Sequence, residues 1–147
     1  DLGGGVGVGY DLKNSRTPGL KEYTALIVSI FGPKSPFRSR LRVLIEPGRT
    51  ISANAGTLVT RVLFRKARAT RDFLIVDAGM NDLIRPALYG AWMGIEPVRR
   101  NAGEQTRLYD VVGPVCESGD FLAETREIGG QHAGGDLDGG HGLRLGA

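Results

Sequence analysis

The sequence has little cysteine, few aromatic residues and no long apolar run. Its 147 residues include one cysteine, Cys116, which excludes an internal disulfide and indicates a reducing, cytoplasmic compartment. No apolar stretch approaches the roughly 20 residues that a membrane-spanning helix requires. The first residues lack the basic and apolar pattern of a signal peptide, and no initiator methionine is present. We therefore expect a cytoplasmic protein without a membrane partner, whose chain begins inside a longer protein.

The remaining composition is typical of a folded globular domain. Hydrophobic residues make up 41% and charged residues 24%, and the length is sufficient for one domain with a core. The net charge is +3, and arginines concentrate in the segments 38–42 and 61–71. A basic patch can bind nucleic acid, but only Phe64 is interleaved with the second cluster, and no helix-turn-helix or zinc spacing accompanies it. We expect these arginines to form a solvated surface and no nucleic-acid partner.

The first fifty residues follow the order of an α/β unit. A glycine-rich start precedes Thr17-Pro18, which is typical of a helix N-terminus, and apolar residues at helical spacing continue to Gly32-Pro33. A short β-type run at 41–45 then ends at the turn Pro47-Gly48. This succession of loop, helix, strand and loop predicts the end of an α/β domain.

Beyond residue 50 one β-strand pattern follows another. Apolar and β-branched runs occupy residues 56–64, 72–77, 91–98 and 106–112. Strands in succession with hairpin-length loops predict an antiparallel sheet or barrel. We therefore expect a β domain at 51–128, with the domain boundary near residue 50.

The last segment, residues 129–147, has a third composition. Eight of its residues are glycine, and both histidines of the chain, His132 and His141, lie in it. Such a tail can bind metal, but no helix aligns these histidines and no cysteine lies near them. We expect a disordered segment and no metal site.

Two segments of the first part have features of a phosphate site. Gly3-Gly4-Gly5 leaves backbone N–H groups open to an anion, although it matches no dinucleotide or P-loop motif, and a mobile terminus is the alternative. Glu46-Pro47-Gly48-Arg49 follows an apolar strand, at the edge of an α/β domain that faces the active site. Its backbone donors and the Arg49 guanidinium suit a phosphate or carboxylate. An ordinary Pro-Gly turn with a solvated arginine is the alternative.

Arg85 and Tyr89 form a candidate carboxylate site. If a short helix begins near Asn81, the spacing of four residues places both side chains on one face. Pro86 is compatible with such a helix only in its first turn. A guanidinium with a phenol hydroxyl binds carboxylates well. A surface pair on a helical turn is the alternative.

The segment Gly113-Pro114-Val115-Cys116-Glu117-Ser118-Gly119-Asp120 contains the only thiol of the chain, next to a carboxylate and between turn-forming residues. On an extended segment the two side chains diverge, so that they serve different neighbours. Cys116 is then a candidate proton donor, and Glu117 a candidate acceptor for a cationic group. A packed cysteine beside a solvated glutamate is the alternative.

Together these segments resemble diaminopimelate decarboxylases, pyridoxal-phosphate enzymes of lysine biosynthesis. The motifs at 46–49, 81–89 and 113–120 stand in that family's order and roughly its spacing, and the resemblance extends from Asp1 to about Thr125. Ornithine- and arginine-type decarboxylases of the same fold usually carry Cys-Asp where this chain has Cys116-Glu117.

The resemblance implies a fold, a cofactor and a substrate. Residues 1–50 would be the C-terminal end of a TIM (β/α) barrel, followed by an antiparallel β-barrel or sandwich, with the chain truncated at both ends. Pyridoxal phosphate would be bound through its phosphate by Gly3, Gly4, Gly5, Glu46, Pro47, Gly48 and Arg49. The substrate would be meso-2,6-diaminopimelate, which the parent enzyme converts to L-lysine and carbon dioxide.

The resemblance also implies roles for individual residues. Arg49, Arg85 and Tyr89 would hold the substrate carboxylates. Glu117 would receive the distal ammonium, and Cys116 would reprotonate the α-carbon. The enzyme would be a homodimer in which the Cys-Glu segment of one subunit completes the site of the other.

The chain departs from the family pattern in two places. The lysine that binds the cofactor and its partner histidine belong to the N-terminal part of the family's barrel, and none of Lys13, Lys21, Lys34 and Lys66 replaces that lysine. We therefore expect this chain alone to be inactive. The family's Gly-Ala-Tyr-Gly does not follow Gly135-Asp136-Leu137, so that we also expect the tail 129–147 to be foreign or read out of frame.

Two other functions are compatible with the sequence. The first is a non-catalytic module, either a dimerising β domain or a weak binder of phosphate or nucleic acid. The second is another basic-amino-acid decarboxylase of the same fold.

Overall fold

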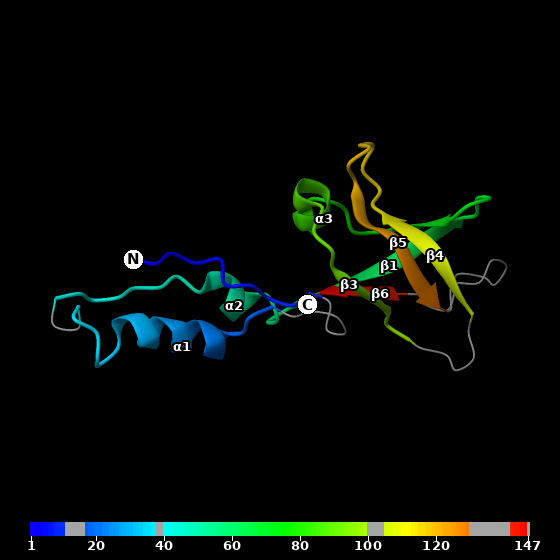
Figure 1. Cartoon of the computed structure of the whole chain (residues 1–147). Coiled ribbons are helices and arrows are strands. Elements are labelled where there is room, and N and C mark those ends of the chain that lie inside the picture. The colour runs from blue at the N-terminus through cyan, green and yellow to red at the C-terminus, as the bar shows by residue number, and fades with distance from the viewer. Residues whose placement is uncertain (11–16, 38–39, 100–104, 130–141, 147) are drawn as a thin grey trace. The chain divides into compact units, whose positions relative to one another are not determined.

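A computed structural model describes residues 1–10, 17–37, 40–99, 105–129 and 142–146. It divides into two compact units, Asp1–Gly56 and Thr57–Gly146, which are considered separately here (Figure 1). This division lies close to the boundary near residue 50 that the sequence indicates. No helix in the described ranges is both long and apolar enough to cross a membrane.

The first unit contains helix α1, Leu20–Phe31, and the short helix α2, Gly48–Ser52. Helix α1 begins after Gly19, two residues beyond the expected Thr17, and ends at Gly32, whose N–H donates to the Val28 carbonyl at 2.8 Å. No residue of α1 is buried. The predicted apolar stripe consists of Leu20, Tyr23, Ile27 and Ile30; Leu20 and Ile30 are exposed, whereas Tyr23 and Ile27 are half-buried. The stripe is therefore only partly covered within the described part of this unit.

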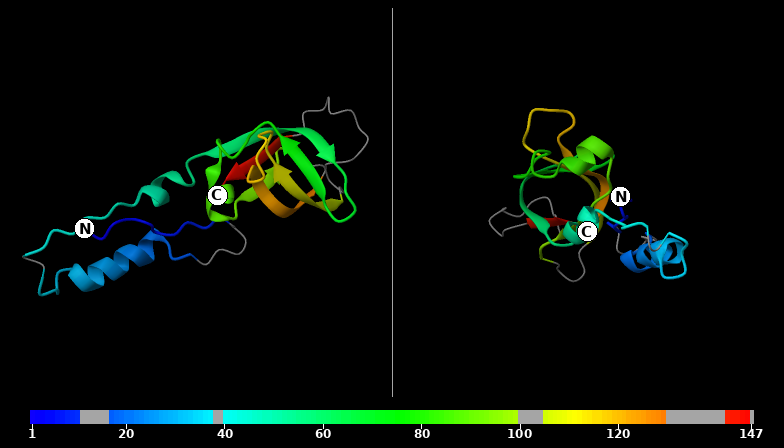
Figure 2. Two further views of the ribbon diagram at one scale, coloured as in Figure 1. Left: turned by 90° about the horizontal axis from the view of Figure 1, so that it is seen from above. Right: turned by 90° about the vertical axis from the view of Figure 1, so that its left-hand side faces the viewer.

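The second unit is a six-stranded sheet of order β3-β6-β1-β2-β4-β5. Its strands are β1 Thr57–Lys66, β2 Asp72–Val76, β3 Gly94–Pro97, β4 Thr106–Val112, β5 Phe121–Gly129 and β6 Gly142–Gly146. The β1–β2 pair is an antiparallel hairpin, as the sequence predicts, and β4–β5 is a second one. The sheet curls round so that its edge strands β3 and β5 approach each other (Figure 2).

The expectation of a wholly antiparallel sheet is wrong at one pair. β2 and β4 run parallel, with Leu74 opposite Val111. Helix α3, Ile84–Tyr89, and strand β3 lie between them in the chain and supply the long crossover that a parallel pair requires. β3 pairs with β6 instead of with its neighbour in sequence, β4.

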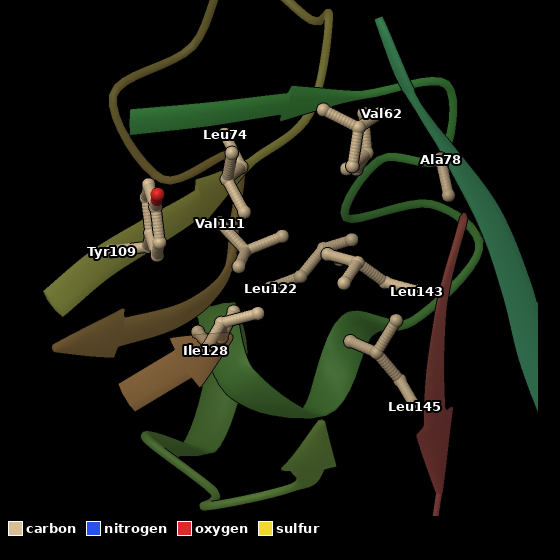
Figure 3. Close-up of a cluster of buried hydrophobic side chains, with 11 residues drawn as sticks. Val62, Leu74, Ala78, Tyr109, Val111, Leu122, Ile128, Leu143 and Leu145 are labelled. Carbon is tan, nitrogen blue, oxygen red and sulfur yellow. The ribbon is translucent and has the colours of Figure 1, made fainter. Parts of the chain in front are cut away.

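The expectation of disorder is wrong for the end of the tail. Strand β6 lies between β3 and β1, and its Leu143 and Leu145 are 0% and 1% exposed. Both leucines join the core cluster of this unit, together with residues such as Leu74 and Leu122 (Figure 3). Gly-Leu-Arg-Leu-Gly has the two-residue period of a strand with one buried face, which the high glycine content obscured. Residues 130–141, with both histidines, lie outside the described ranges.

Some of the arginines expected on a solvated surface pair with buried carboxylates instead. Arg65 contacts Asp72 at 2.5 Å, and Arg71 contacts Asp110 at 2.8 Å. The Asp72 and Asp110 side chains are each 6% exposed. This cluster is therefore partly neutralised within the sheet unit, which weakens the case for an anionic partner there.

Candidate functional site

The glycine segment and the 46–49 segment lie next to each other in the first unit. The Glu46 N–H donates to the Gly3 carbonyl at 2.8 Å, and the Leu2 N–H donates to the Leu44 carbonyl at 3.0 Å. A Cβ on Gly4 would lie 2.3 Å from the Glu46 carbonyl oxygen, so that only glycine permits this approach. The two predicted phosphate-binding segments therefore form one surface.

Backbone donors on that surface are available to an anion. In the described part of the unit, the N–H groups of Gly4 and Gly5 donate to no acceptor. Gly5 has a φ of +79°, which a residue with a side chain rarely adopts. Gly48 has open space where a side chain would begin, and Arg49 is exposed on α2. These features fit a bound phosphate.

Helix α3 brings Arg85 and Tyr89 together in the second unit. The Arg85 guanidinium carbon lies 5.3 Å from the centre of the Tyr89 ring. Arg85 is half-buried and Tyr89 is 67% exposed. Pro86 lies in the first turn of α3, where the sequence requires it. The pair presents a cation and a phenol on one face, as the spacing predicts.

The Cys116–Glu117 segment is an exposed turn and not an extended strand. The Glu117 N–H donates to the Val115 carbonyl at 2.8 Å, and the Asp120 N–H donates to the Glu117 carbonyl at 3.1 Å. Cys116 and Glu117 are both exposed. Neither lies in a dry interior, so both are accessible to another molecule.

The chemistry of Glu117 fits a cation-binding role. Its Oε1 accepts the Gly119 N–H at 3.2 Å and the Ser118 hydroxyl at 3.0 Å. These hydrogen bonds, first from Gly119 and then from Ser118, lower the pKa of the Glu117 carboxyl. The side chain is therefore ionised at neutral pH and oriented by its own turn.

Sequence reasoning did not assign a role to Asp120, which organises this loop. Its carboxylate accepts the Val115 N–H at 2.7 Å and the Met80 N–H at 2.6 Å. The loop 113–120 is thereby attached to the turn that precedes α3. The sequence offered one indication of this role, since Asp120 is the last residue of the turn-forming segment that begins with Gly113.

The structure therefore places the predicted residues in both units. Gly3, Gly4, Gly5 and the 46–49 segment form one group in the first unit. In the second unit, Arg85 and Tyr89 lie together on α3, and Cys116 and Glu117 share a turn that Asp120 links to the segment before α3.

A family model described as "Pyridoxal-dependent decarboxylase, C-terminal sheet domain" matches residues 10–137, most of the chain. The chain belongs to this family. The curled sheet of the second unit is accordingly the sheet domain of pyridoxal-dependent decarboxylases. Residues 129–137 of the tail lie within the match, which argues against a wholly foreign tail.

Curated relatives within the pyridoxal-dependent decarboxylase family are similar over most of this chain. A diaminopimelate decarboxylase of Pseudomonas aeruginosa is 49% identical over 129 residues, which cover 87% of this chain and 29% of that protein. One of Haemophilus influenzae is 45% identical over 128 residues, with the same coverage. The chain thus spans under a third of the length of these relatives.

Solved structures of family members show the same architecture. A diaminopimelate decarboxylase from M. jannaschii superposes with a TM-score of 0.83 at 28% identity, covering 99% of this chain and 31% of that one. The Helicobacter pylori enzyme, complexed with L-lysine, gives a TM-score of 0.76 at 34% identity, covering 98% and 32%.

Proposed function

We propose that this chain is the C-terminal part of a diaminopimelate decarboxylase, whose complete form converts meso-2,6-diaminopimelate to L-lysine and carbon dioxide. The observation that carries the proposal is the exposed turn that places the chain's only thiol, Cys116, beside the oriented and ionised carboxylate of Glu117. The family membership and the relatives at 45% and 49% identity support the same reaction. The preceding barrel would come from a part of the protein that this chain does not include.

The proposed cofactor is pyridoxal phosphate. The family's description and the surface formed by Gly4 and Glu46 support it, since a side chain at position 4 would fill the space between them. Gly3, Gly4, Gly5, Gly48 and Arg49 would hold its phosphate through N–H groups and the guanidinium. When bound, the cofactor supplies a ring that accepts the electrons left on the α-carbon as carbon dioxide departs.

The residues of this chain would bind and orient a substrate that is charged at both ends. Arg49, Arg85 and the Tyr89 hydroxyl would hold its carboxylates. The Glu117 carboxylate would accept N–H bonds from the distal ammonium, which distinguishes this substrate from amino acids that lack one. The Cys116 Sγ would deliver a proton to the α-carbon.

The partly covered apolar stripe of α1 supports a barrel in the complete enzyme. None of the residues of its apolar stripe is buried, and Leu20 and Ile30 at the two ends of the stripe are exposed. Barrel helices bury such a stripe against their strands. We further propose a homodimer in which Cys116 and Glu117 complete the site of the partner subunit, because both lie on an exposed turn. The compartment of the complete enzyme would be the cytoplasm.

The test uses a hybrid enzyme, in which the N-terminal part of the Pseudomonas aeruginosa relative precedes this chain. Lysine and carbon dioxide are measured with meso-diaminopimelate, ornithine and arginine as substrates, with the unmodified relative as positive control. We expect lysine formation, and a loss of about 100-fold or more in kcat for Cys116→Ala. A hybrid that binds pyridoxal phosphate but forms no lysine, or prefers ornithine or arginine, would contradict the proposal.

A further inference from the structure

The Asp120 carboxylate joins two segments that the proposed function places in substrate sites. Its Oδ1 accepts the Met80 N–H at 2.6 Å, and its Oδ2 accepts the Val115 N–H at 2.7 Å. Met80 lies in the turn before α3, and Val115 is the residue before Cys116. One side chain therefore holds the backbone of both segments.

The surroundings of Asp120 admit its carboxylate and little else. The residue is 4% exposed, so that water competes weakly for its oxygens. A Cβ on Gly113 would lie 2.3 Å from Oδ2, and one on Gly79 would lie 3.2 Å from Oδ1. The Gly113 N–H also donates to the Asp120 carbonyl at 3.0 Å. Gly79 and Gly113 thus leave room for the carboxylate that accepts the Met80 and Val115 N–H groups.

The turn around Met80 transmits its position to α3. The Gly79 N–H donates to Asp82 Oδ2 at 2.9 Å, and the Asp82 and Leu83 N–H groups donate to the Gly79 carbonyl at 2.9 and 3.2 Å. Helix α3 begins at the next residue, Ile84. A displacement of Met80 therefore moves the helix that carries the proposed carboxylate-binding pair.

We propose that Asp120 is a positioning residue that keeps the Cys116 turn and helix α3 of one chain in fixed relation. The roles of the two segments rest on the proposed function, whereas the link itself rests on the hydrogen bonds. In the proposed dimer, Cys116 completes the partner subunit's site while α3 serves its own. The Asp120 carboxylate then holds, within one chain, a segment of each of the two active sites of the dimer.

The first test compares Asp120→Asn with Asp110→Asn in the 147-residue chain. Asp110 is the control because it is also 4% exposed and its carboxylate accepts a backbone N–H, that of Thr125 at 2.8 Å; unlike Asp120, it also pairs with Arg71. Amide hydrogen exchange is measured at Met80 and Val115, and alkylation is measured at the single thiol, Cys116.

An amide nitrogen in Asp120→Asn replaces one acceptor oxygen, so that at least one N–H loses its partner. We expect Met80 or Val115 to exchange about tenfold faster or more, and the Cys116 alkylation rate to change. We expect Asp110→Asn to leave both readouts as in the unmodified chain. Equal acceleration in the two variants, or none in Asp120→Asn, overturns the proposal.

If Asp120→Asn does not fold, amide hydrogen exchange in the unmodified chain tests the proposal. The Met80 and Val115 amides must then show the same protection, because one opening event releases both. Unrelated protection overturns the proposal.

The second test measures whether the Asp120 link affects the rate of decarboxylation. In the hybrid enzyme, Asp120→Asn should lower kcat/KM for meso-diaminopimelate about tenfold or more, with Asp110→Asn near the unmodified value. Faster exchange with an unchanged kcat/KM overturns the positioning role and leaves the proposed function intact. An unmodified hybrid that forms no lysine contradicts the proposed function, while the exchange result still decides the link.

Discussion

Replacing Leu143 by alanine tests whether the glycine-rich end of the chain is a structural strand. Leu143 is 0% exposed in β6, a strand with neighbours on both sides. A Leu→Ala change in a packed core removes several buried carbons and leaves a cavity, which lowers the free energy of unfolding by about 2–5 kcal/mol. Because β6 lies inside the sheet, its neighbours β1 and β3 can close that cavity only in part.

The assay is urea denaturation of the 147-residue chain. The fluorescence of Trp92, the only tryptophan, reports on the sheet unit, where its ring lies 4.5 Å from the Arg126 guanidinium carbon. With a typical urea dependence of about 1–3 kcal/mol per molar, the midpoint should fall by at least roughly 0.7 M, and by roughly 1.8 M for the middle of both ranges. Far-UV circular dichroism should show the same midpoint if unfolding is two-state.

Leu108→Ala is the matched control, because it makes the same change on a strand where the side chain is 43% exposed. We expect it to lower the free energy of unfolding by less than about 1 kcal/mol. If Leu143→Ala shifts the midpoint no more than Leu108→Ala, Leu143 is not part of the core, and the end of the chain is not a structural strand.

Three further predictions concern charge and the site. The hydrogen bond from the Arg65 side chain lowers the pKa of Asp72. Its contribution to the free energy of unfolding is therefore present above the unfolded pKa of about 3.9 and is lost as the pH falls through the lower folded pKa. The free energy of unfolding should depend less on acid pH in Asp72→Asn, and an unchanged dependence would show that this carboxylate contributes nothing to acid stability. Gly4→Ala places a Cβ against the Glu46 carbonyl and should weaken pyridoxal-phosphate binding by the hybrid about tenfold or more, measured by equilibrium dialysis; an unchanged affinity would exclude this surface. Glu117→Gln should raise the KM for meso-diaminopimelate about tenfold or more, because the distal ammonium loses its counter-charge, and a KM near that of the unmodified hybrid would remove Glu117 from the site.

Local patterns in the sequence predicted the elements that depend on neighbouring residues. The helix ending before Gly32, the hairpin of β1 and β2, and the first-turn place of Pro86 follow from turn and capping chemistry within a few positions. The parallel pairing of β2 with β4 and the insertion of β6 between β1 and β3 depend on contacts between distant residues. Periodicity reports which face of a strand is buried but not which strand lies beside it.

In the candidate site, too, the sequence predicted what depends on neighbouring residues and missed what depends on distant contacts. Residue types and spacing identified the Arg85–Tyr89 pair and the adjacent Cys116 and Glu117, because each pair lies within one short segment. The sequence analysis treated the second pair as extended, whereas it lies on a turn. The contribution of Asp120 was missed because its two acceptor bonds reach a neighbouring turn and a residue 40 positions earlier. Its aspartate was visible in the motif, but the backbone donors that it serves carry no side-chain signature.

The most direct test of the proposed shared site uses two inactive hybrids, Cys116→Ala and Arg85→Ala, produced together in equal amounts. If Cys116 of one subunit meets Arg85 of the other, each mixed dimer has one intact site of two. Since half of the dimers are mixed, lysine formation should recover to about a quarter of the unmodified rate. If the mixture forms lysine no faster than either variant alone, the two residues do not meet across subunits, and the account of a shared decarboxylase site is contradicted.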